Sequence, residues 1–315
     1  MEKQGNAAVA VVLLAMAAVG YLVVVVSKPA VVKRPPVVPS PIPTVSLTPT
    51  LSPSPIPPSS PSPTPTKKPA PTIATPKPVT GPPGTGYSRI TVATERGNFT
   101  ASVLSLDLAG VKIITDTAND SECGSGCAVM ALGDFVSRNG GFAGVNGTYF
   151  CPSTYGECSS KSNSFDFPVY NSRLGRWING GNLFWDSRSM IYFDGSGVYY
   201  KQNAKDFGGG LSAGIVNHPG LLDGGNVQID DSQSGLSEKQ KAKGTKVGIG
   251  IRGDKSLMVV IAQNVTMQEL AYVFKALGAN GALNLDSGGS VALYYDGKYL
   301  TGPGRNIPNA IVFAR

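Results

Sequence analysis

Acidic residues are absent from one long stretch of the 315-residue sequence, residues 27–86, which carries six basic residues. The part that follows, residues 87–315, carries 20 basic and 19 acidic residues, so the net charge of +7 comes almost wholly from the first stretch. A nucleic-acid-binding domain is expected to concentrate its positive charge on the folded part of the chain. We therefore predict no nucleic-acid partner.

The same stretch holds twenty of the 25 prolines, mixed with Ser and Thr. This composition cannot bury a core and predicts an extended, disordered linker. It follows an uncharged run, residues 7–26, that is long enough to span a bilayer. We predict a tail (residues 1–6), a single-pass signal-anchor helix (7–26), a linker (27–86) and one globular domain (87–315). A cleaved signal peptide is the alternative, but Lys28 and Pro29 stand where small residues are expected for cleavage.

Two features bear on which side of the membrane the domain lies, and they disagree. Lys28, Lys33 and Arg34 follow the apolar run, and this charge bias favours a cytoplasmic domain. The linker has the composition of stalks that hold a domain away from a membrane surface. Together with the cysteines described below, it leads us to expect an extracytoplasmic domain.

Histidine is almost missing, since His218 is the only one. This matters because the loop Asp286-Ser-Gly-Gly-Ser matches part of the nucleophile loop of trypsin-like serine proteases. A serine nucleophile needs a base to accept its proton. His218 lies in the turn sequence IVNHPGLLDGG, outside any context of a protease histidine. The sequence therefore argues against a protease.

The four cysteines lie close together, at positions 123, 127, 151 and 158. An even number behind a membrane anchor favours two disulfides, and we expect local pairing of Cys123 with Cys127 and of Cys151 with Cys158. A zinc site is the alternative. Its common ligand spacings fit poorly here, and no histidine lies nearby. We expect neither a metal nor another cofactor.

The globular part is rich in strand-forming segments and contains two helical patterns. A capping box, Thr266-Met-Gln-Glu269, opens an apolar helical repeat that ends at Gly278, and a second helix is predicted over 128–138. Strands are predicted at 90–94, 100–106, 144–150, 190–193, 198–201, 247–251, 257–262, 282–286, 291–295 and 310–313. We expect an α+β domain with a mixed β-sheet core and helices packed on it.

Four polar residues stand at or near the ends of predicted strands: Asn146, Lys246, Asp286 and Arg305. Asp286 ends an apolar strand and is followed by a glycine-rich loop, whose backbone N–H groups can approach an anion closely. This combination predicts a site for a phosphate-bearing substrate. The alternative is that Asp286 only caps its own turn.

The segments that carry these residues resemble the phosphodiester glycosidase family over about residues 92–313. The matching segments are AGVNGTYF, HPGLLDGG, KVGIGI, TMQELAYVFKALGA, LNLDSGGS and RNIPNAIV. Two positions depart from the family pattern, because Ser287 stands where the family usually has Gly, and Lys246 where it usually has Arg. Lysine keeps the charge but loses the planar fork for bidentate phosphate contact.

The resemblance implies hydrolysis of the glycosidic C–O bond of a sugar-1-phosphodiester, here in a phosphorylated glycan of the cell envelope. It implies three catalytic residues, Asp286, Asn146 and Arg305, with Asp286 as nucleophile or as base for water. The implied residues for substrate or phosphate binding are Lys246, Ser287, Gly288, Gly289, Ser290, Tyr149 and Asn309. The rival function is a non-catalytic carbohydrate-binding module, with Tyr149, Tyr155, Trp177 and Trp185 stacking on sugars.

Overall fold

The computed structural model describes residues 78–81, 83–184, 188–232 and 235–315. The predicted membrane anchor, residues 27–77 of the predicted linker and Trp185 lie outside these ranges. The end of the predicted linker is described, and there Val79 bridges Val92 and Gly86 opens the first strand. Within them, no helix is long and apolar enough to cross a bilayer.

Seventeen strands of the described chain form three sheets. The first sheet has the order β1-β2-β13-β12-β14-β10-β11, with β1 Gly86–Thr94, β2 Gly97–Leu106, β13 Leu257–Val265, β12 Gly244–Arg252, β14 Ala279–Asn284, β10 Gly220–Asp223 and β11 Asn226–Val227. The second has the order β16-β15-β4-β17-β3, with β16 Lys298–Thr301, β15 Leu293–Tyr295, β4 Gly141–Asn146, β17 Asn309–Ala314 and β3 Lys112–Thr117. The third has the order β6-β5-β9-β7-β8, with β6 Arg176–Ile178, β5 Val169–Asn171, β9 Ala213–Asn217, β7 Ser189–Phe193 and β8 Val198–Lys201.

The first sheet is buried on both faces, and β13 shows why. Alternate residues of a strand point to opposite faces of its sheet. Val259 and Ile261 enter a core shared by all three sheets, whereas Met258 and Val260 enter a second core under helix α4 (Met267–Ala276). An uninterrupted apolar run is therefore needed in β13, and the sequence supplies it.

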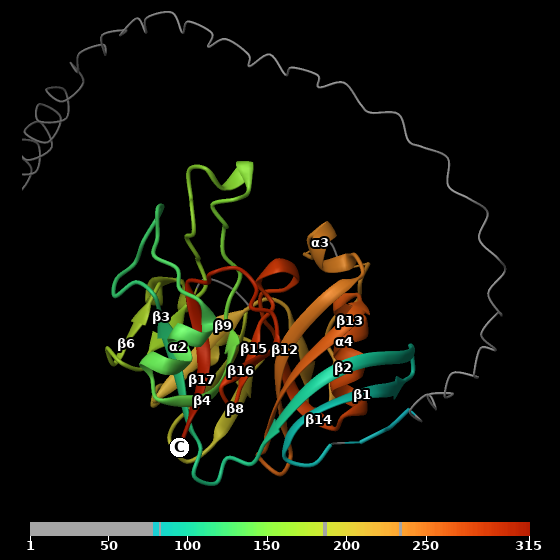
Figure 1. The fold of residues 1–315 in the computed structure, drawn as a ribbon. Helices are drawn as coiled ribbons and strands as arrows, with labels where there is room; N and C mark the ends of the chain where they lie inside the picture. The colour runs from blue at the N-terminus through green and yellow to red at the C-terminus, as the bar shows by residue number, and fades with distance from the viewer. Residues whose placement is uncertain (1–77, 82, 185–187, 233–234) are drawn as a thin grey trace, which may run out of the picture. The chain divides into compact units, whose positions relative to one another are not determined.

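Helix α4 packs on the face of the first sheet opposite the other two sheets (Figure 1). Thr266 and Glu269 form the predicted capping box, which confirms this helix. Its Phe274 ring lies so close to β12 that a Cβ at Gly248 would come within 2.8 Å of the ring, and one at Gly250 within 2.7 Å. The two glycines of KVGIGI therefore let the helix pack directly on the strand.

The predicted fold class, α+β with a mixed sheet and packed helices, is wrong. The fold is predominantly β, with three antiparallel sheets and three α-helices in the described chain: α4, α2 (Leu132–Arg138) and α3 (Glu238–Lys241). Mixed sheets were expected because β3-α2-β4 and β13-α4-β14 follow the order of parallel units. However, β17 lies between β3 and β4, and β12 lies between β13 and β14, so every neighbouring pair is antiparallel.

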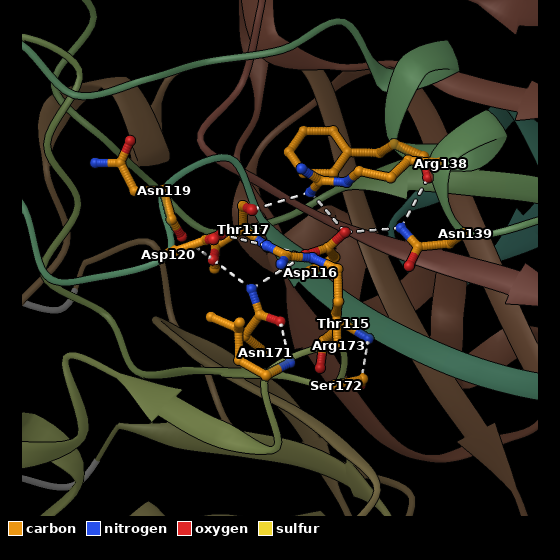
Figure 2. Close-up of polar contacts among 12 residues, drawn as sticks. Thr115, Asp116, Thr117, Asn119, Asp120, Arg138, Asn139, Asn171, Ser172 and Arg173 are labelled. Carbon is orange, nitrogen blue, oxygen red and sulfur yellow. Dashed lines mark hydrogen bonds and ion pairs between the residues drawn. The ribbon is translucent and has the colours of Figure 1, made fainter.

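The second and third sheets are joined by a polar network centred on the Asp116 carboxylate, which is fully buried (Figure 2). Asp116 accepts hydrogen bonds from Arg138 at 2.6 Å, from Asn139 at 2.7 Å and from Asn171 at 3.1 Å. These donors come from α2, from its C-terminal cap and from β5. A carboxylate with several donors tolerates burial, whereas an unpaired one does not. The network thus ties three elements together.

We expect Asp116→Asn to lower the free energy of unfolding by about 3 kcal/mol. The amide carries no charge to pair with Arg138, and its NH₂ group would face the N–H donors that now bond the carboxylate. Chemical denaturation of the domain measures this change. Asp120→Asn is the control, since Asp120 pairs with Arg173 at the exposed edge of the same cluster and such pairs contribute little. Equal losses in both variants would contradict the role given to Asp116.

Candidate active site

The loop of residues 285–292 carries the chain from β14 of the first sheet to β15 of the second. Backbone bonds fix its entry, with Leu285 N–H donating to Val247 at 2.9 Å and Asp286 N–H to Gly147 at 2.8 Å. The Asn146 side chain, at the end of β4, spans the loop. Its Nδ2 donates to the Asp286 carbonyl at 2.7 Å, and its Oδ1 accepts from the Ala292 N–H at 3.0 Å. The loop is therefore held at both ends by one amide.

A cavity of about 530 Å³ opens beside this loop. Asp286 and the glycine-rich residues 287–290 form one part of its lining, segment 237–246 with helix α3 forms another, and the loop of residues 149–158 forms a third. In Figure 1, α3 and the long loop after β4 extend beyond the same end of the sheets. Three segments distant in sequence thus meet at one end of the fold.

The Asp286 carboxyl is the buried acid of this cavity, with 8% of the residue exposed. Burial raises the pKa of Asp286 to about 7, against the opposing effects of a hydrogen bond from Ser290 and the positive charge of Arg305. Around neutral pH the carboxyl is therefore divided between its two protonation states. Carboxyls with such values at a cavity surface are typical of acid–base or nucleophilic sites.

Four basic residues line the cavity with Asp286. Lys239 and Lys243 pair with glutamates, which leaves Arg305 and Lys246. Nη1 of Arg305 is buried without a hydrogen-bond partner, and no carboxylate of the described chain forms an ion pair with either cation. Lys246 Nζ donates to the Lys239 carbonyl at 2.6 Å, and burial lowers the pKa of its ammonium. Buried cations without an acidic partner favour binding of an anionic ligand.

The glycine-rich loop is shaped for close contact with Arg305. Gly288 has a φ of +69°, in the left-handed region that favours glycine, and a Cβ at Gly289 would come within 2.4 Å of Arg305 Nη2. The Gly289 carbonyl also accepts from the Arg305 N–H at 3.0 Å. Because both glycines lack a side chain, the guanidinium can lie against the loop beside Asp286.

Ser287 and Tyr149 both form hydrogen bonds on the cavity wall. The Tyr149 hydroxyl accepts from Asn284 at 2.7 Å and from Gln240 at 3.4 Å, and Ser287 Oγ accepts from the Val247 N–H at 3.4 Å. Ser287 Oγ donates to the Leu285 carbonyl at 3.2 Å. Burial raises the pKa of Tyr149 to about 12, so the phenol stays protonated. The serine at the unusual position thus supports the loop through its hydroxyl.

Two predicted site residues do not line the cavity. Asn146 is fully buried, and both of its amide groups are bonded to the 285–292 loop, so it positions that loop rather than touching a ligand. Asn146 also begins the sequence Asn-Gly-Thr, a glycosylation sequon, but its complete burial leaves no room for a glycan. Asn309 is likewise buried, bonding the backbone N–H and the side chain of Thr148 at 2.8 Å and 2.9 Å. The other predicted binding residues, those at 149, 246, 287–290 and 305, all line the cavity.

Both predicted disulfides are present, Cys123–Cys127 and Cys151–Cys158, and the second lines the cavity. Sequence patterns did not predict four further polar lining residues, which are Lys239, Gln240, Lys243 and Glu157. They lie in loops or in the short helix α3, where no strand end or apolar period marks them. Within the described ranges, no group of three or more His, Cys, Asp or Glu side chains gathers as a metal site.

The raised pKa of Asp286 predicts a pH-dependent stability. Its folded value, about 7, exceeds the value near 3.8 of the unfolded chain, so the protonated carboxyl is favoured by folding. The contribution of this protonated carboxyl to the free energy of unfolding is complete below pH 4 and is lost as the pH rises through 7. Relative to Asp286→Asn, the wild type should therefore lose up to about 4 kcal/mol of unfolding free energy between pH 4 and pH 8. Parallel denaturation curves at both pH values measure the difference, and a constant difference would contradict the buried, raised carboxyl.

Known proteins share the sequence profile and the fold of this chain. The sequence profile of the phosphodiester glycosidase family matches residues 139–314, more than half of the chain. No curated protein sequence matches. The solved catalytic domain of zebrafish N-acetylglucosamine-1-phosphodiester alpha-N-acetylglucosaminidase, auto-inhibited by its pro-peptide, is similar with a TM-score of 0.56 at 13% identity, over 73% of this chain and 82% of that one.

A hypothetical protein from Synechocystis is similar in fold, with a TM-score of 0.50 at 13% identity. The match covers 73% of this chain and 62% of that protein, so this chain spans less than two thirds of its length. At these identities both structures support the fold alone, while the profile match confirms the resemblance seen in the motifs. The chain belongs to the phosphodiester glycosidase family, a family of glycosidase-type hydrolases.

Proposed function

We propose that this protein hydrolyses the glycosidic C–O bond of a sugar-1-phosphodiester in a glycopolymer of the cell envelope. The observation that carries the proposal is the cavity itself. A buried carboxyl, Asp286, lies there with two cations, Arg305 and Lys246, that have no carboxylate partner in the described chain. The name of the zebrafish enzyme describes cleavage at an N-acetylglucosamine-1-phosphodiester, which is the same bond type.

The leaving group explains this set of residues. Ordinary glycosides have poor alkoxide leaving groups, so their hydrolases pair a protonated acid with a second carboxylate. A phosphate monoester leaves more readily, and cations that stabilise its growing charge replace much of the work of the acid. The second carboxyl of the cavity, Glu157, is exposed and pairs with Lys239. Asp286 with Arg305 and Lys246 therefore suffices for a sugar-1-phosphodiester.

Each group has a defined task in the reaction. Arg305 and Lys246 bind the phosphodiester, and the bond between the anomeric carbon and the phosphate oxygen breaks with its electron pair on that oxygen. Ionised Asp286 either attacks the anomeric carbon or removes a proton from the attacking water. If Asp286 attacks, water then hydrolyses the resulting glycosyl ester and frees the carboxylate. In both routes the oxygen of water and one of its protons form the new hydroxyl at the anomeric carbon, and the other proton is released or passes to the phosphate monoester. Asn146 contributes by holding the loop that carries Asp286.

We place the domain outside the cytoplasm as part of the same proposal. The apolar run 7–26 would anchor it, and the proline-rich linker would hold it away from the membrane. Two disulfides support an oxidising compartment, since such bonds are rare in the cytosol. An outward-facing domain of this kind would meet envelope polymers directly.

We expect Asp286→Asn and Arg305→Ala each to lower the release of phosphate monoester from sugar-1-phosphodiesters by at least about 1000-fold, because each removes a group that acts in the transition state. Teichoic and capsular fragments serve as substrates, with free sugar detected by mass spectrometry. Asp296→Asn, in an exposed turn, is the control and should stay active. Wild-type binding of these fragments without product would instead favour the carbohydrate-binding module.

Activity should also follow the ionisation of Asp286. Because the ionised carboxylate is the reactive form, kcat/KM should rise with pH and level off above about 7. A pH–rate profile of the wild type measures this limb. A rate that falls as the pH passes 7 would assign Asp286 as a general acid instead.

Ser287→Gly should remain within about threefold of wild-type activity and lose about 1 kcal/mol of stability, because the hydroxyl bonds only the backbone of Leu285 and Val247. Steady-state kinetics and denaturation measure the two effects. Labelling of Ser287 by a serine-directed fluorophosphonate, with loss of activity, would show instead that the hydroxyl is a nucleophile.

A further inference from the structure

The Cys151–Cys158 disulfide closes a short loop that forms one wall of the cavity. The loop is also held by internal backbone bonds, from Tyr155 N–H to Pro152 at 3.0 Å and from Cys158 N–H to Tyr155 at 2.9 Å. These cross-links restrict the loop to a narrow set of conformations. Tyr155, at its centre, is therefore a fixed side chain on the cavity wall.

The Tyr155 ring contacts two cations from other segments. The Arg305 guanidinium carbon lies 4.9 Å from the ring centroid, and the Lys239 ammonium lies 4.5 Å from it. Lys239 also pairs with Glu157 of the same loop at 3.7 Å. Cation–π contacts of this length are attractive. The disulfide-closed loop thus contacts both Arg305 and the α3 segment, which also line the cavity.

The contact with Arg305 is directional as well. Arg305 Nη2 donates to the Tyr155 hydroxyl at 3.1 Å, while Nη1 is buried with no partner. Tyr155 therefore fixes one arm of the guanidinium fork, while the hydrogen-bonding capacity of the other arm is unused in the described chain. Arginine loses less rotamer freedom on binding an anion when its fork is held beforehand.

We propose that Tyr155 is a positioning residue for Arg305, and that the Cys151–Cys158 disulfide holds Tyr155 in place for this task. The proposal rests on the proposed function in that Arg305 binds the phosphate group of the substrate. It adds a specific requirement, namely that phosphate affinity at Arg305 depends on the Tyr155 hydroxyl and on an intact loop.

A double-mutant cycle on phosphate affinity tests this requirement directly. Inorganic phosphate is titrated into the wild type, Tyr155→Phe, Arg305→Ala and the double variant by calorimetry. We expect Tyr155→Phe, which keeps the ring and loses only the hydroxyl, to bind phosphate about tenfold more weakly than the wild type does. In the Arg305→Ala background the same change should have no effect, because the residue on which Tyr155 acts is absent.

The two disulfides offer a matched pair of variants. Cys151→Ser with Cys158→Ser should weaken phosphate binding as Tyr155→Phe does. Cys123→Ser with Cys127→Ser removes a disulfide that does not line the cavity, and it should leave the affinity within about twofold. If the first pair unfolds the domain, the cycle on Tyr155 still decides the question.

The outcomes separate this proposal from the proposed function. Equal effects of Tyr155→Phe with and without Arg305, or no phosphate binding by the wild type, would overturn the positioning role. A coupled loss of phosphate affinity, in an enzyme that releases no sugar from sugar-1-phosphodiesters, would sustain the positioning role and reject the proposed reaction.

Discussion

The geometry of the cavity depends on one buried amide, the Asn146 side chain. The chain leaves the first sheet at β14 and enters the second at β15, and Asn146 bonds the backbone at both ends of the connecting loop. An amide is suited to this task because it donates from one atom and accepts at the other. Asp286, Gly289 and Ser290 all lie on the stretch that it spans. Asn146, which the family motif AGVNGTYF marked as a catalytic residue, therefore acts by holding the loop that carries Asp286.

Charge and burial act together on the supported loop. The fold removes Asp286 from water, which raises its pKa, and places Arg305 and Lys246 around the same cavity without acidic partners in the described chain. Each group is costly to bury alone. In the proposed reaction, a bound phosphodiester would supply the missing anion for the cations, and its departure as a monoester would increase the negative charge next to them. The arrangement would therefore stabilise the leaving group more strongly as the reaction proceeds.

Sequence patterns predicted features that depend on neighbouring residues. Helix α4 followed from its capping box, the two disulfides from cysteine spacing, and β13 from its apolar run. The clustering of Asp286, Lys246 and Arg305 followed from family motifs. The antiparallel sheets were not predictable, because the strands inserted between β3 and β4, and between β13 and β14, come from distant parts of the chain. For the same reason the sequence placed Asn146 and Asn309 among substrate-contacting residues, although their partners are buried backbone and Thr148.

In the proposed reaction, the bond between the anomeric carbon and the phosphate oxygen breaks, and no bond to phosphorus changes. Hydrolysis of a synthetic sugar-1-phosphodiester in H₂¹⁸O tests this reaction, because the label marks the atom that water attacks. We expect ¹⁸O on the anomeric carbon of the released sugar and none in the phosphate monoester. Label in the phosphate product would mean attack at phosphorus and would contradict the roles assigned to Asp286, Arg305 and Lys246.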